Sequence, residues 1–128
     1  MMVSNHIRLI SLNPQGLKSP GRLNALLYES KRKQVDALLL QECNFDFASE
    51  SYVRETARNH GYLACVGYSD NRGGSAIFLR ASTFNLDPRK PIEYTSALQG
   101  RVTFVSVAVG DTHLKLCSMY VPAGTQER

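Results

Sequence analysis

The sequence lacks the features that mark several broad classes of protein. Its longest apolar stretches, such as residues 37–40, are strand-sized and fall short of the roughly 18 residues of a membrane span. Residues 1–8 lack the basic and apolar regions of a secretory signal, and the three cysteines form no CxxC or CxxH pair. We therefore expect no membrane association, no zinc site and no disulfide framework, in an intracellular protein that is nuclear or cytoplasmic and not secreted.

The charge balance of the chain is basic. The 128 residues carry a net charge of +4 with a pI near 9.1, and their number suits one small domain. A basic chain favours an anionic partner such as nucleic acid, but an excess of this size also falls within ordinary surface variation. Composition alone leaves the two interpretations equally open.

The first part of the chain predicts two strands and two helices. Apolar alternation at residues 6–12 predicts a strand, and the unbroken apolar run at 35–41 predicts a second strand that is buried on both faces. Residues 22–34 are rich in helix formers. Residues 49–60 place apolar side chains on one helical face, after Ser49 as the N-cap.

The second part of the chain predicts β structure. Strands are expected at residues 63–68 and 74–79, followed by a proline-containing connector. A hairpin then joins residues 101–109 and 112–120 through a two-residue turn of the favoured kind. The pattern predicts a layered, mixed α/β arrangement with no internal repeat and no linker.

Polar side chains stand where three of these strands end. Asn13 follows the first strand, Glu42 the second, and Tyr120 ends the last. Strand ends often carry sites, because a rigid element aims the side chain and a loop gives access. One carboxylate with a neutral amide is typical of Mg²⁺ sites, since Mg²⁺ keeps several waters. From spacing alone, however, Glu42 is more often just the first solvated residue after a strand.

Four segments in order resemble motifs of the endonuclease/exonuclease/phosphatase superfamily. They are LISLNPQGLK at residues 9–18, VDALLLQE at 35–42, RGGSAIFL at 72–79 and LKLCSMYVPAG at 114–124. Each motif is weak alone, but four in the right order span nearly the whole chain. Within the superfamily, the opening segment most resembles the apurinic/apyrimidinic-type endonuclease domain of LINE-type (non-LTR) retrotransposons.

The resemblance implies a fold in the α/β (α+β) class. Residues 1–128 would be a partial domain, the N-terminal half of a four-layered α-β-β-α sandwich. A mixed, mostly antiparallel sheet would carry two helices on its outer face. A lone half is expected to expose the inner face of its sheet and to self-associate. Cys65 and Cys117, which lie in apolar runs, are expected to be small core residues.

The resemblance also implies roles for the residues at the strand ends. Glu42 would ligate a catalytic Mg²⁺, for which Mn²⁺ could substitute, and Asn13 would support it by orienting the carboxylate or a metal-bound water. Tyr120 would place its hydroxyl against the scissile phosphate. The implied activity is Mg²⁺-dependent phosphodiester hydrolysis, most simply by a DNA endonuclease with retrotransposon-type nicking activity.

Some features depart from the family pattern. Gln15, Lys18 and Arg72 are the candidate nucleic-acid contacts, but Gln15 stands where Asp or Asn is common, which weakens any metal role there. The family's later Asp-x-Asn and terminal Asp-His motifs do not occur in these residues. We therefore expect the chain to be inactive alone, and to work with the C-terminal half of the domain or a reverse transcriptase in a longer polypeptide. The alternatives are a small-molecule or lipid phosphodiesterase or phosphatase, and a catalytically dead remnant or binding module.

Overall fold

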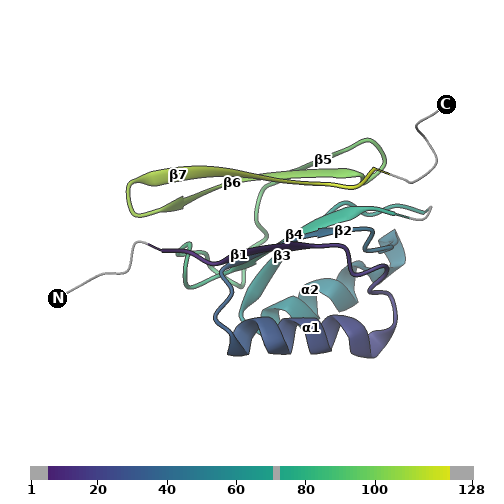
Figure 1. The fold of residues 1–128 in the computed structure, drawn as a ribbon, viewed down its shortest axis with the longest axis horizontal. Helices are drawn as coiled ribbons and strands as arrows, with labels where there is room; N and C mark the ends of the chain where they lie inside the picture. Colours follow the sequence, from purple (N-terminus) through teal and green to yellow (C-terminus); the bar gives the residue numbers. More distant parts are fainter. Residues whose placement is uncertain (1–5, 71–72, 122–128) are drawn as a thin grey trace.

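A computed structural model describes residues 6–70 and 73–121. Two helices, α1 (Pro20–Arg32) and α2 (Glu50–Asn59), cover one face of a four-stranded sheet, and a three-stranded sheet lies on its other face (Figure 1). The first sheet contains β1 (Leu9–Leu12), β2 (Ala37–Gln41), β3 (Tyr62–Val66) and β4 (Ser75–Arg80). The second contains β5 (Thr95–Ala97), β6 (Val102–Val109) and β7 (Thr112–Met119), and a 3-10 turn, η1 (Phe47–Ser49), precedes α2.

The first sheet has the strand order β1-β2-β4-β3, and only the β1–β2 pair is parallel. A parallel pair needs a long crossover, which α1 supplies. Leu9 lies opposite Ala37 and Leu12 opposite Leu40. The two strands therefore end at the same edge of the sheet, and the residues that follow them start side by side.

Side chains of the first sheet alternate between two cores. Leu38 and Leu40 of β2 point toward the helices and are fully buried there with Leu27 and Val53. Ala37 points the other way, into a second core between the sheets, built of Ala37, Cys65, Ile77, Leu79, Phe84, Val105, Val107 and Leu116. The unbroken apolar run of β2 is explained by this burial on both faces, as expected.

Asp36 ties down the opposite end of the sheet from Glu42. Its carboxylate accepts hydrogen bonds from the Arg8 backbone N–H at 2.7 Å and from the Thr83 hydroxyl. The Arg80 guanidinium lies 3.7 Å away. The Asp that introduces the second motif therefore has a structural role at the start of β2.

The expectation of an exposed inner sheet face is wrong. The β5–β7 sheet covers that face, so the uncovered surface is the outer face of this second sheet, where Phe104 and Met119 are 47% and 53% exposed. Cys117 is also exposed and is not a core residue, because alternation along β7 turns Leu116 and Ser118 inward and Cys117 outward. Cys65 is buried as expected. Among the described residues, neither helix has the length and apolarity to cross a bilayer.

Candidate functional site

Asn13 and Glu42 meet where β1 and β2 end. The Asn13 Nδ2 group donates a hydrogen bond of 3.3 Å to Glu42 Oε1. Asn13 Oδ1 in turn accepts the Gln15 backbone N–H at 2.9 Å, which fixes the direction of the amide. The amide therefore orients the Glu42 carboxylate, and the structure shows no hydrogen-bond partner for Glu42 Oε2 among the described residues.

The backbone around these side chains is in an unfavourable conformation. Glu42 has φ +54°, and Gln15 and Asn44 have φ +55° and +62°, in the left-handed region that side chains other than glycine rarely adopt. Hydrogen bonds of 2.8 Å from the Gly16 N–H to the Glu42 carbonyl and 2.9 Å from Leu17 to the Cys43 carbonyl hold the two loops together. Such strain persists only where surrounding contacts enforce it, and it is enriched at functional sites.

A third loop joins through Asn44. The Gly73 N–H donates to Asn44 Oδ1 at 2.6 Å, and the Asn44 N–H donates to the Gly73 carbonyl at 2.7 Å. Gly73 has φ +111°, and a Cβ there would lie 2.7 Å from the Tyr120 ring. The ring therefore packs on bare backbone, which places Tyr120 beside the loop that carries Glu42.

Hydrogen bonds to the first sheet and to Arg101 hold Tyr120 and β7 next to these three loops. The Tyr120 N–H donates to the Arg101 carbonyl at 2.8 Å. Gln41 Nε2 reaches Ser118 Oγ at 3.2 Å, and that hydroxyl donates to the Leu40 carbonyl at 2.6 Å. The glutamine before Glu42 thus bridges the two sheets.

The other candidate residues near Glu42 differ in exposure and in pairing. Gln15 is exposed on the first loop, and Arg72 lies outside the described residues. Lys18 is engaged: its Nζ lies 2.8 Å from Asp46 Oδ2, and this contact lowers the pKa of the Asp46 carboxyl. Cys43, next to Glu42, is buried, and burial raises the pKa of its thiol well above the usual range. The Cys43 side chain packs in the core beneath the helices.

Sequence reasoning missed Asn44, Gln41 and Ser118. Gln41 stands in the Gln-Glu motif, yet its contact with Ser118 joins residues distant in sequence. A polar side chain at an inward position of β7 was the available signal, since such groups need partners when buried. Asn44 gave a weaker signal, because asparagine tolerates the left-handed conformation.

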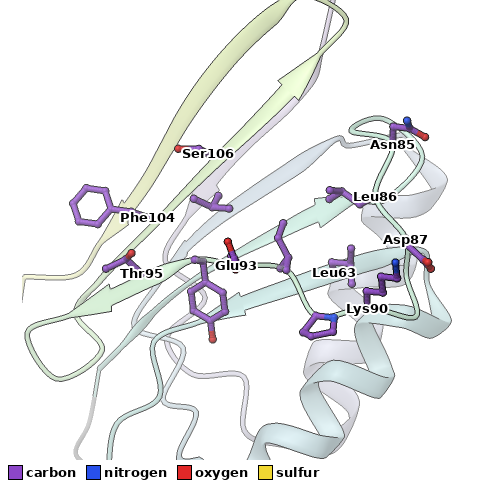
Figure 2. A pocket seen from close by; sticks show the side chains of 13 residues that line it. Leu63, Asn85, Leu86, Asp87, Lys90, Glu93, Thr95, Phe104 and Ser106 are labelled. Carbon is purple, nitrogen blue, oxygen red and sulfur yellow. The ribbon is translucent and has the colours of Figure 1, made fainter.

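A hollow in the described part of the chain lies away from these loops. It measures about 900 Å³ and opens between the connector before β5 and the edge of β6, lined by Leu63, Leu86, Ile92, Tyr94 and Phe104 among others (Figure 2). Its acidic Asp87 is paired with Arg89 at 3.2 Å. Asn85 in its lining also has a left-handed backbone, at φ +53°, but no lining residue shares a hydrogen bond with Asn13 or Glu42 in the described part of the chain, so this hollow is a weaker candidate than the Glu42 loops.

Comparison with known proteins defines the fold. No family model and no curated protein matches the chain. Solved structures do match: an AP endonuclease from Archaeoglobus fulgidus is 19% identical with a TM-score of 0.68, over 93% of this chain and 42% of that one. The AP endonuclease LMAP from Leishmania major is 19% identical with a TM-score of 0.65, over 91% of this chain and 40% of that one. D. rerio TDP2 complexed with single-strand DNA product is 20% identical with a TM-score of 0.61, over 93% of this chain and 48% of that one.

The chain thus spans less than half the length of these similar proteins. Identities near 20% show the fold alone. The expectation of a mixed α/β fold, with two helices on the outer face and half of an α-β-β-α sandwich, is confirmed.

Proposed function

We propose that residues 1–128 form the metal-binding part of a Mg²⁺-dependent phosphodiesterase of the endonuclease/exonuclease/phosphatase type that acts on DNA. The observation that carries the proposal is the strained, amide-oriented carboxylate of Glu42 at the joined ends of β1 and β2. The fold is shared with proteins described as AP endonucleases and with TDP2 bound to a DNA product. A retrotransposon origin is a narrower prediction, carried only by the opening motif.

The donor set fits one ligand position of a hard cation. Glu42 offers a carboxylate oxygen, and Mg²⁺ commonly takes one or two carboxylates and keeps water elsewhere. A bound Mg²⁺ would polarise the phosphate and stabilise the leaving oxygen; Mn²⁺ can supply the same chemistry. Asn13 keeps the carboxylate in one orientation through its Nδ2 contact. Tyr120, packed on Gly73, holds a hydroxyl near the same loop, where it can donate to a phosphate oxygen.

One observation favours a second candidate, a binding module without turnover. The described residues hold no group of three or more His, Cys, Asp and Glu side chains that could bind a metal. Glu42 is hydrogen-bonded to the Asn13 amide, and His60 lies against Asn24 at 2.7 Å, so neither contact supplies an imidazole general base at Glu42. We therefore infer that Glu42 supplies one metal ligand only, and that turnover needs further groups from the C-terminal half of the domain or another part of a longer polypeptide.

The test is nicking of supercoiled plasmid in Mg²⁺ by the chain and by its Glu42→Ala variant, with EDTA as the control. We expect no Mg²⁺-dependent nicking by residues 1–128. In a longer polypeptide that also carries the C-terminal half of the domain, here called the completed protein, we expect Mg²⁺-dependent nicking that is lost again in Glu42→Ala. Nicking by residues 1–128 that Glu42→Ala abolishes would refute the need for a second half. Nicking by the completed protein that survives Glu42→Ala would refute the role of Glu42.

A further inference from the structure

An exposed aromatic ring follows closely after Glu42. Phe47 begins η1, the short turn between the Glu42 loop and α2, and its side chain is 64% exposed. Single exposed apolar side chains are common on proteins, so exposure alone assigns no function. Three further observations concern how this ring is held.

The turn that carries Phe47 is tied down at Asp46. The Asp46 carboxylate accepts the Ser49 hydroxyl at 2.7 Å, and the Asp46 carbonyl accepts the Ser49 N–H at 3.0 Å. Lys18 reaches the same carboxylate at 2.8 Å, which links η1 to the loop after β1. A ring on so restrained a turn loses little conformational entropy when a ligand packs on it.

A second ring backs the first. The centroids of Phe47 and Tyr68 lie 5.8 Å apart with an interplanar angle of 33°. Tyr68 is half-buried against the core beneath the helices, and this burial raises its pKa, so its hydroxyl stays neutral. Tyr68 therefore supports one side of Phe47, and much of the Phe47 ring remains open to solvent.

The loop of Phe47 is continuous with the candidate site. The Ser69 N–H donates to the Phe45 carbonyl at 2.9 Å, next to η1, while Asn44 binds Gly73 in the same pair of loops. The loop that presents Glu42 and the turn that presents Phe47 are thus one restrained unit. Only residues 43–46 separate Glu42 from Phe47 along the chain, so a polymer is the kind of ligand that would contact both.

We propose that Phe47 is a stacking platform for an unpaired nucleobase of the strand bound at Glu42, an inference that rests on the proposed function. Aromatic side chains stack bases of any sequence, and the base must be unpaired and unstacked for its face to be free. Lys18 beside the turn is paired with Asp46, so the aromatic ring and not a local excess of positive charge would make the contact. The ligand class is therefore single-stranded DNA, or duplex DNA with an unpaired base.

The test compares two probes of equal charge by fluorescence anisotropy in Mg²⁺, in which residues 1–128 are expected not to cleave: a short single-stranded oligonucleotide, and an oligomer of the same length without bases. Phe47→Ala should weaken binding of the oligonucleotide by roughly 5- to 150-fold, the loss for one stacked base, and leave the baseless oligomer unaffected. Phe47→Trp should retain the affinity. Phe104→Ala is the matched control, because Phe104 is another exposed ring, on the outer face of the second sheet.

Each other outcome has a definite meaning. An equal loss on both probes, no loss with Phe47→Ala, or the same loss with Phe104→Ala would overturn the platform. Failure of the wild-type chain to bind either probe would overturn both the platform and the nucleic-acid part of the proposed function. Base-dependent binding lost in Phe47→Ala would sustain the platform even where the completed protein fails to nick DNA, so the two proposals fail separately.

Discussion

The left-handed backbone of Glu42 predicts an inverted preference between glycine and alanine. At φ +54° a side chain costs about 1 kcal/mol or more, and glycine avoids this cost. Glu42→Gly and Glu42→Ala both lose the carboxylate and its contact with Asn13, so that loss cancels between them. We expect the glycine variant to be more stable than the alanine variant by about 1 kcal/mol.

Glu55 is the matched control. It is exposed in the middle of α2, where glycine is less stable than alanine by about 1 kcal/mol. The glycine–alanine difference should therefore change sign between the two positions, a total contrast of about 2 kcal/mol. Urea unfolding followed by circular dichroism measures it. A Glu42→Ala variant that equals or exceeds Glu42→Gly in stability would refute the conclusion that this position is strained.

Four further predictions concern the surroundings of the site. Gly73→Ala should lower the free energy of unfolding by about 2 kcal/mol in urea unfolding, because residue 73 has φ +111° and the added Cβ would meet the Tyr120 ring. A change within ~0.5 kcal/mol would contradict the packing of Tyr120 on Gly73. Thiol labelling at neutral pH should modify one of the three cysteines quickly, the exposed Cys117, since burial raises the pKa of the other two thiols; Cys117→Ser should abolish this phase, and persistent fast labelling would count against it. Lys18→Ala should raise the pKa of the Asp46 carboxyl in an NMR titration, and an unmoved pKa would exclude their contact in solution. Residues 1–128 should self-associate at high concentration through the uncovered face of the second sheet, and Met119→Lys should reduce this in light scattering; a monomeric wild type would refute it.

The sequence predicts well what depends on local pattern. The alternation in β6, the apolar run of β2 and the amphipathic α2 all fall close to their expected positions. Boundaries shift where local chemistry acts: α1 begins at Pro20, because proline is favoured in the first turn of a helix. The three exposed residues of β5 were missed, since so short a polar strand has no hydrophobic pattern to mark it.

Arrangement between distant elements was the harder part. No local pattern shows that β6 and β7 fold back over β2, so the inner face of the sheet was wrongly expected to be exposed. Asn13 and Glu42 were identified at strand ends, and the parallel β1–β2 register brings them together. The tie from Asn44 to Gly73 and the pairing of Lys18 with Asp46 depend on loop geometry, which residue spacing does not encode.

The central claim is that Glu42 holds a divalent metal ion, and paramagnetic NMR tests it directly. Substoichiometric Mn²⁺ added to the labelled chain should broaden the amide signals of Asn13, Glu42 and Gly73, and excess Mg²⁺ should restore them. The same signals should stay sharp in Glu42→Gln. Broadening that persists in that variant, or that centres on a distant carboxylate such as Asp87, would contradict the account.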